Sequence, residues 1–195
     1  MFKEFDSLVE QSIPKYAEMV SQIVFPVLID RNEVINCLDI GCGAGRSSYE
    51  ILTSFPNAQL TCFDVDKKQL EKAKTSLAEF SSRIEFAEGD FSSHDFDEQF
   101  DIIISTFTLS HLEKQEKLEW LRKIRQLLAE NGYFICADKV SFRSIELNDA
   151  FDVVASGQSK PLPVTSELFL LKKANFSLRD IVWRYREYAV WYARK

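Results

Sequence analysis

Three closely spaced glycines follow the first apolar run of the chain, and this stretch constrains the fold most strongly. The run Val34–Ile40 predicts a buried strand of a parallel sheet. Gly41, Gly43 and Gly45 come directly after it, where glycine lets the backbone turn with a positive φ and leaves space for a ligand. Residues 47–55 then have a helical pattern. A strand, a glycine turn and a helix N-terminus in this order predict a cradle for a nucleotide-containing cofactor.

The bulk composition is that of one soluble domain and limits the range of partners. The chain has 195 residues and a net charge of −6. An acidic chain is poorly suited to unaided binding of nucleic acid, which depends on neutralising phosphates. The N-terminus is too acidic for a signal peptide, and no apolar run reaches the ~20 residues that span a bilayer. We therefore predict a cytoplasmic monomer or homodimer that does not bind a membrane, with nucleic acid disfavoured as a partner but left open.

The four cysteines predict reduced, buried thiols rather than a metal site. None of them forms a Cys-x-x-Cys pair, and three fall within predicted strands. His94 and His111 are the only histidines, so a zinc site of cysteine and histidine ligands is not expected. Thiols of this kind are typical of proteins in a reducing compartment.

Apolar runs and helical patterns alternate along the rest of the chain. Strands are expected at residues 59–65, 84–88, 100–105 and 133–138, and two late apolar-aromatic strands at 180–186 and 188–193. The expected helices include 114–129 and 165–174, with Gly132 and Asn175 in left-handed positions after them. This alternation predicts a parallel sheet with helices on both faces and a ligand at the carboxyl ends of the strands. We expect one domain over residues 1–195.

Two segments outside the glycine loop have roles that the sequence leaves open. Residues 1–30 have a helical pattern in which Ser12 is the expected N-cap. They form either a packing helix over the sheet edge or a lid over the cofactor, with Tyr16 facing it. Residues 139–164 have little periodicity beyond a short helix expected at 145–154, and we assign them to the substrate side of the site.

The glycine loop departs from the patterns that bind pyrophosphate. In the dinucleotide fingerprint G-x-G-x-x-G the third glycine stands where this chain has Arg46, and no Gly-Lys-Ser/Thr of a phosphate-binding loop follows. Asp39 lies two positions ahead of Gly41 and places an acid beside the loop, where it would repel a pyrophosphate and support a cation. S-adenosylmethionine (SAM) carries a sulfonium, an ammonium and no phosphate, so the loop favours SAM.

Acidic residues follow the second and third predicted strands at positions suited to a nucleoside. Asp64 lies about 20 positions after Gly43 and can accept hydrogen bonds from both ribose hydroxyls. Asp90 can accept a hydrogen bond from the adenine amine, and Val65 and Phe91 can enclose the adenine ring. The alternative is that the two carboxylates only cap helices or bond to loops.

Taken together, the motifs resemble those of class I SAM-dependent methyltransferases over nearly the whole chain. The segments that carry the resemblance are LDIGCGAG at 38–45, FDVD at 63–66, EGDF at 88–91, and the stretches 100–112 and 127–138. The resemblance implies an α/β, Rossmann-like fold with a mostly parallel seven-stranded sheet, helices on both faces and an antiparallel C-terminal strand. It also implies SAM as cofactor, S-adenosylhomocysteine (SAH) as product, and cofactor contacts from Gly41, Cys42 and Gly43.

A narrower resemblance is to the carboxy-SAM synthase group, which makes a carboxylated SAM used in tRNA modification. The segments that carry it are QSIPKY at 11–16, TFTL at 106–109 and KVSF at 139–142. It implies cofactor contacts from Tyr16 and Thr106. The carboxylate-binding arginine of that group lies in a longer insert after the fifth strand, whereas residues 144–164 of this chain offer only Lys160 as a cation. We therefore expect plain SAM and methyl transfer to a small-molecule acceptor.

The reacting groups are expected beyond the fourth and fifth predicted strands. His111 is a candidate general base, because histidine exchanges protons near neutral pH, and Asp138 is a candidate base or substrate anchor. Both residues also have plain structural interpretations, since many methyl transfers need only positioning. Three other functions stay open: a carboxy-SAM or tRNA modification enzyme, a SAM-binding module without catalysis, and a short-chain NAD enzyme, which Arg46 disfavours.

The last two predicted strands are dense in aromatic and basic residues. The aromatic residues are Trp183, Tyr185, Tyr188, Trp191 and Tyr192. They are expected to pack in the core, and the alternative is that they form a substrate pocket or a dimer surface. The basic residues are Arg179, Arg184, Arg186, Arg194 and Lys195. They are the one hint in the sequence of an RNA-facing patch, and a solvated face of a strand is the plainer interpretation.

Overall fold

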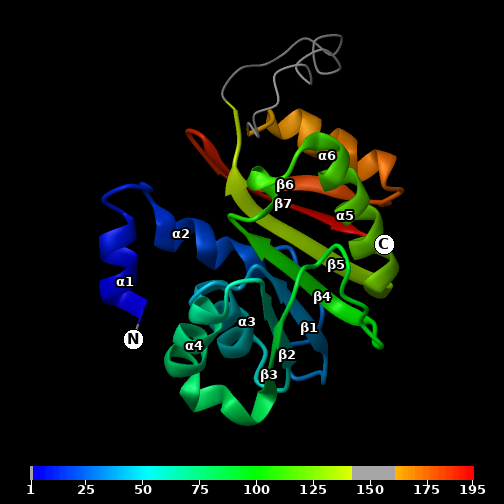
Figure 1. Ribbon diagram of the computed structural model, residues 1–195. Helices are drawn as coiled ribbons and strands as arrows, with labels where there is room; N and C mark the ends of the chain where they lie inside the picture. The colour runs from blue at the N-terminus through cyan, green and yellow to red at the C-terminus, as the bar shows by residue number, and fades with distance from the viewer. Residues whose placement is uncertain (1, 142–160) are drawn as a thin grey trace.

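The apolar runs pair into one seven-stranded sheet through the middle of the molecule (Figure 1). The computed structural model describes residues 2–141 and 161–195. The strands are β1 (Asn36–Ile40), β2 (Gln59–Asp64), β3 (Ile84–Glu88), β4 (Phe100–Thr106), β5 (Leu128–Lys139), β6 (Arg179–Tyr185) and β7 (Tyr188–Arg194). Their order across the sheet is β3-β2-β1-β4-β5-β7-β6. The predicted α/β class and seven-stranded sheet are confirmed.

The strand directions place a crevice beside β1. Strands β1 to β5 run parallel to one another, and β7 is antiparallel to both β5 and β6. The chain passes outward from β1 through β2 to β3 and then returns to β4 on the other side of β1. Such a reversal of strand order opens a crevice at the carboxyl ends of the strands, where ligands bind.

Helices cover both faces of the sheet, as the sequence predicts (Figure 1). They are α1 (Phe2–Val9), α2 (Tyr16–Ser21), α3 (Arg46–Ser54), α4 (Lys67–Ser76), α5 (Lys114–Leu127) and α6 (Val164–Lys173), with short 3₁₀ turns η1 (Gln22–Val24), η2 (Ala78–Arg83) and η3 (Leu109–His111). One hydrophobic cluster contains side chains of α2, α3 and α4, and a second contains side chains of α5 and α6. The sheet therefore separates two cores.

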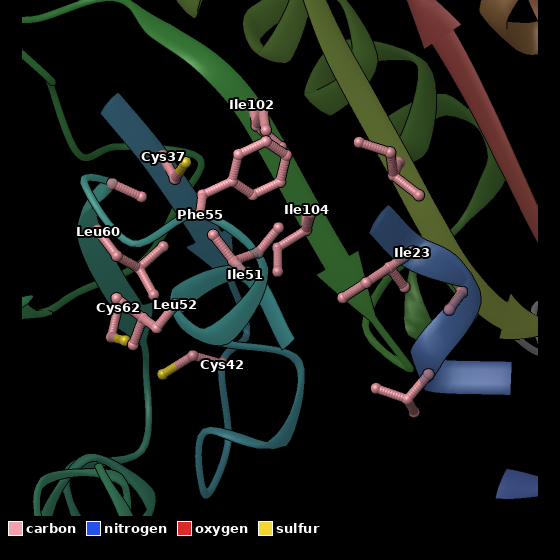
Figure 2. Packing of buried hydrophobic residues seen from close by; sticks show 14 of the residues in the cluster. Ile23, Cys37, Cys42, Ile51, Leu52, Phe55, Leu60, Cys62, Ile102 and Ile104 are labelled. Carbon is pink, nitrogen blue, oxygen red and sulfur yellow. The ribbon is translucent and has the colours of Figure 1, made fainter. Parts of the chain in front are cut away.

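Alternation along each strand assigns its side chains to the two cores. In β1, Cys37 belongs to the first cluster, whereas Leu38 and Ile40 belong to the second, as the period of two in a strand requires. Figure 2 shows Ile51 of α3 and Phe55, the residue after this helix, among the strand side chains of the first cluster. Burying a side chain of this size stabilises the fold by about 1.5–3 kcal/mol.

Several local expectations are wrong at the ends of elements. The N-terminal region does not form a helix capped by Ser12: the chain turns at Lys15, which has φ 63°, and α2 begins only at Tyr16. The left-handed residue of this region is Asn131, with φ 62°, rather than Gly132, and it lies inside β5 because that strand already begins at Leu128. Helix α5 ends at Leu127, earlier than predicted, because Leu128 already pairs with β4.

Other expectations are confirmed or lie outside the described part of the chain. Asn175 takes the left-handed position after α6, with φ 66°. All four cysteines are buried and free of disulfides. The short helix expected at 145–154 lies outside the described residues. Within the described ranges, no helix has the length and apolar character needed to cross a membrane.

Candidate functional site

A cavity of about 920 Å³ lies at the carboxyl ends of β1, β2 and β4, within the usual size range of ligand sites. Ten of the site residues predicted from the sequence line it: Tyr16, Gly41, Cys42, Gly43, Asp64, Val65, Asp90, Phe91, Thr106 and His111. The exceptions are Asp39 and Asp138, which are buried and absent from the cavity wall.

The glycine loop needs its glycines because of its conformation and its neighbours. Gly41, Gly43 and Gly45 have φ of 71°, 54° and 88°, in the left-handed region that favours glycine. A Cβ atom on Gly41 would collide with the Thr108 side chain, whereas a Cβ on Gly43 would meet nothing within 4 Å. The loop is therefore packed tightly against the end of β4 at Gly41 and faces open space at Gly43.

Asp64 fixes the end of β2 against this loop. Its Oδ2 accepts a hydrogen bond of 2.8 Å from the Gly43 N–H, and its Oδ1 accepts one of 2.8 Å from the Asp66 N–H. Asp66 in turn caps α4 by accepting from the Lys68 N–H. A carboxylate has about four lone-pair sites, so Asp64 keeps acceptor capacity toward the cavity.

The next part of the wall is apolar and aromatic. Phe91 is 2% exposed, and its ring lies 4.7 Å from that of Trp120, whereas Val65 is 73% exposed. Asp90 accepts a hydrogen bond from the Ser92 N–H at 2.8 Å. All but Ser92 line the cavity, so the region combines flat apolar surface with a carboxylate, which suits a purine base.

Helix α5 holds the loop that carries Phe91. Lys123 Nζ donates to the carbonyls of Phe91 at 2.7 Å and of His94. The Trp120 indole N–H donates to Ser92 Oγ at 3.0 Å. The loop after β3 is therefore fastened from one side by one helix.

The end of β4 carries an unusual aromatic residue. Phe107 has φ 54°, a conformation that is rare for a bulky side chain and is strained by about 1–3 kcal/mol. Its ring stacks on Tyr16, with centroids 6.1 Å apart and planes at 22°. Burial raises the pKa of the Tyr16 phenol to about 12, so this group stays uncharged. Both rings line the cavity.

Asp138 is buried behind the turn that carries His111 and does not line the cavity, where the sequence placed it. Its Oδ2 accepts a 2.8 Å hydrogen bond from the N–H of Ser110, and its Oδ1 accepts one from the Lys139 N–H. The side chain is 1% exposed because it points from β5 toward the core of α5 and α6, and burial raises its pKa. His111 is exposed on the same turn and lines the cavity.

Asp39 also departs from its expected role. It is fully buried on the α3 side of β1, where its Oδ2 accepts hydrogen bonds from the hydroxyls of Ser47 at 2.8 Å and Ser48 at 2.6 Å. Burial raises its pKa to about 6, and the two serine hydroxyls oppose this. Asp39 therefore anchors the start of α3 beneath the glycine loop and does not reach the cavity wall.

Arg46 ties the N-terminal helix to the site. Its guanidinium donates to Asp6 of α1 at 2.8 Å and to Glu50 at 2.6 Å, and it lies 5.6 Å from the Phe2 ring. Phe5 of the same helix lines the cavity and packs on Tyr16 at 6.1 Å. Helix α1 thus covers one end of the cavity.

Comparisons with known proteins agree with this geometry. A family described as a methyltransferase domain matches residues 38–134. The chain is 23% identical to the carboxy-S-adenosyl-L-methionine synthase of Campylobacter hominis, over 98% of this chain and 90% of that protein. It is 24% identical to the enzyme of the same name from Campylobacter lari, over 74% of this chain and 61% of that protein. These matches, with the fold and the glycine loop, support a class I SAM-dependent methyltransferase.

A solved structure of the same fold extends the comparison. Human N-acetylserotonin methyltransferase in complex with SAM superposes with a TM-score of 0.70 and 21% identity, over 90% of this chain. The chain spans 51% of the length of the human enzyme. Its sheet and helices therefore correspond to only about half of that protein.

The cavity of this methyltransferase fits SAM. Thr106 Oγ1 is buried without a hydrogen-bond partner, so the wall holds a polar atom suited to a ligand. The open space beside Gly43 and the free acceptor capacity of Asp64 lie next to each other. A hydrogen bond with Cys62 and burial raise the pKa of the Cys42 thiol, which keeps this part of the wall uncharged.

Sequence reasoning missed several residues that shape the site, among them Phe5, Arg46 as an anchor for α1, Phe107 and Trp120. Phe107 adjoins Thr106 at a strand end, but no sequence pattern reveals a positive φ at phenylalanine. Trp120 stands at a helical position whose apolar neighbours suggest ordinary core packing. A closer reading of Arg46 could have paired its charge with the acidic residues near the N-terminus.

Proposed function

We propose that the protein transfers a methyl group from SAM to a small-molecule acceptor. The observation that carries this proposal is the extent of the cavity, which continues from Asp64 and Phe91 to Phe107 and His111. The first pair suits a nucleoside, and the second leaves an apolar region for an acceptor. SAM, when bound, supplies an electrophilic methyl group.

The chain's own residues have separate tasks in this proposal. Asp64 accepts hydrogen bonds from ribose hydroxyls, and Asp90 accepts one from the adenine amine. Tyr16, Thr106 and the glycine loop, including Cys42, hold the amino-acid part, and Val65 and Phe91 enclose the base. His111 accepts the proton of the acceptor where the acceptor has one to lose.

The charges at the cavity favour plain SAM over a carboxylated cofactor. Among the described residues of the wall, Arg46 and Lys72 carry a positive charge. Arg46 is already paired with Asp6 and Glu50, and Lys72 lies on α4, beside the nucleoside region. Because the chain is similar to carboxy-SAM synthases, carboxy-SAM synthesis is the second candidate function. The additional carboxylate of a carboxylated SAM would need a further cation in the cavity.

The basic residues near the C-terminus give little support to an RNA substrate. Arg179, Arg194 and Lys195 donate to backbone carbonyls of Phe176, Asn131 and Leu128. A cation used in this way is less available to a phosphate, so a small acceptor is favoured over tRNA. A cytoplasmic location and a monomeric or homodimeric state stay predictions from the sequence.

We also propose that α1 and α2 form the lid expected of residues 1–30. Phe5 and Tyr16 form part of the cavity wall, and the Arg46–Asp6 pair holds the lid to α3. Residues 139–164 stay assigned to the substrate side, although 142–160 lie outside the described residues.

Thermal melting with ligands tests the proposal. A ligand at 100 times its Kd stabilises the fold by about 2.7 kcal/mol, so SAM or SAH should raise the Tm of a domain of this size by about 5–10 °C. NAD should leave the Tm unchanged. SAH release from SAM in the presence of small hydroxylated or amine acceptors then separates an enzyme from a SAM-binding module. A shift with NAD alone would reject the cofactor assignment.

A further inference from the structure

Phe107 stands apart from the other residues that have a positive φ. Within residues 2–141 and 161–195, the non-glycine residues of this kind are Lys15, Phe107, Asn131, Asn175 and Arg186. Lys15 precedes α2, Arg186 forms the β6–β7 turn, and the two asparagines tolerate the left-handed region. Phe107 alone in this group is aromatic and lines the cavity. Strain of this kind persists where the surrounding structure enforces it, commonly at functional sites.

The contacts of Phe107 show what enforces the conformation. Its N–H donates to the Ala137 carbonyl at 2.9 Å, which joins it to β5. Its ring stacks on Tyr16 and meets Tyr188 edge-on, with centroids 6.0 Å apart. Tyr16 of α2 and Tyr188 of β7 thus hold the ring, and Ala137 of β5 holds the backbone of Phe107, just after β4 and four positions before His111.

The surroundings of the ring define the chemistry that it recognises. Phe5 and Phe107 give this end of the cavity an aromatic wall, and the phenol of Tyr16, which adjoins them on the cofactor side, is uncharged. The nearby Arg46 guanidinium is occupied by Asp6 and Glu50. A charged acceptor would lose its hydration here without gaining a partner, whereas a flat aromatic molecule gains ring contacts.

We propose that Phe107 determines acceptor specificity by providing a fixed aromatic surface for a flat, uncharged aromatic alcohol whose hydroxyl lies toward His111. This inference rests on the proposed function, because it assigns an acceptor class to the same cavity. The strained backbone keeps the ring in the cavity, so the acceptor meets a surface that is already in position.

Matched probes separate aromatic recognition from general apolar binding. The probes are 2-naphthol and its saturated counterpart decahydro-2-naphthol, and calorimetry measures their binding to the SAH complex. The wild-type protein should bind 2-naphthol about 5- to 10-fold more tightly than the saturated alcohol, the preference expected of ring stacking. Equal binding of the two probes, or no binding of 2-naphthol, would overturn the inference.

Two variants remove the ring in different ways. Phe107→Leu keeps an apolar side chain, and Phe107→Gly adopts the positive φ without strain, so at least one variant should fold. In both, the preference for 2-naphthol should fall below about twofold while the SAH affinity changes less than about twofold. Phe25→Leu, at a position that is 72% exposed, is the matched control and should keep the full preference.

The outcomes distinguish the inference from the function beneath it. An unchanged preference in both Phe107 variants overturns the specificity role and leaves SAM binding intact. An equal loss of SAH affinity and probe affinity would instead assign Phe107 to the fold. Failure of the wild-type protein to bind SAH removes the proposed function itself, and the inference with it.

Discussion

Asp64 shows how one side chain joins the fold and the site. Its two oxygens each accept a backbone N–H, from Gly43 and Asp66, so the carboxylate is oriented before any ligand arrives. Orientation of this kind removes an entropic penalty from binding. The remaining lone pairs face the cavity, which Asp64 lines.

Replacing Asp64 with alanine should therefore weaken SAM binding by about 2–3 kcal/mol, because charge-assisted hydrogen bonds contribute about that much. Calorimetric titration with SAH measures the change. Asp66→Ala is the matched control, since it removes only the cap of α4 and should lower stability by about 1 kcal/mol with unchanged affinity. Wild-type affinity in the Asp64 variant would confine Asp64 to a structural role.

Asp39 makes stability depend on pH in a direction opposite to that of a salt-bridged acid. Its folded-state pKa is about 6, above the ~3.9 of an unfolded aspartate, so the folded protein binds the proton more tightly. Protonated Asp39 therefore contributes about 3 kcal/mol to the free energy of unfolding. This contribution is fully present below pH ~4 and is lost as the pH rises through ~6.

The variant Asp39→Asn isolates this effect. Urea unfolding at pH 4, 5, 6 and 7 should show the wild-type free energy of unfolding falling relative to that of the variant across the window. The exposed variant Asp97→Asn serves as control and should follow the wild type. A constant difference between wild type and Asp39→Asn would contradict the raised pKa.

At the scale of elements, the sequence predicted the strands, whose positions depend on hydrophobic patterning. All seven strands were expected near their observed places, because alternation and burial dominate there. Boundaries set by tertiary contact were missed: the end of α5 depends on Leu128 pairing with β4, and the start of α2 on the turn at Lys15. For the site, the cavity residues next to glycines and strand ends were found, whereas Asp39 and Asp138 face the cores because of strand alternation.

Through Lys123, helix α5 holds the loop after β3, which we propose encloses the adenine. The Lys123 ammonium donates to carbonyls of this loop, and Lys123→Met keeps the length of the side chain while removing these bonds. The variant should bind SAH about 10-fold more weakly, the equivalent of one or two such hydrogen bonds. Arg122→Met, at the exposed neighbouring position of α5, should keep wild-type affinity. Equal affinities in the two variants would exclude the positioning role of Lys123.

Helix α1 offers a test of the lid. Asp6→Asn weakens the pair with Arg46, in which the side chains of Arg46 and Asp6 are only 10% and 13% exposed. We expect SAH to dissociate about 3- to 10-fold faster, because an ion pair of this kind contributes about 1 kcal/mol to closure. Stopped-flow fluorescence measures the rate. A wild-type rate in Asp6→Asn, equal to that of the Asp97→Asn control, would show that α1 does not gate the cavity.

Across the whole molecule, the cavity and the most deeply buried ion pair of the described residues lie in different parts of the fold. The cavity lies where the strand order reverses, and the glycine loop and α3 belong to the core on the α2–α4 face. The opposite core, beneath α5 and α6, contains a buried ion pair between Lys117 and Glu167 at 2.6 Å, with side chains only 2% and 3% exposed. Neither residue lines the cavity.

Breaking this pair should therefore destabilise the fold and leave cofactor affinity unchanged. Lys117→Met strands a buried carboxylate and should lower the free energy of unfolding by about 3–5 kcal/mol, whereas the double variant Lys117→Met with Glu167→Leu should recover most of the loss. Urea unfolding measures both. Lys74→Met, which breaks an exposed pair with Glu71, should change stability by less than about 1 kcal/mol. A double variant as unstable as Lys117→Met alone would mean that packing around the lysine, rather than the stranded charge, holds α5 and α6 together.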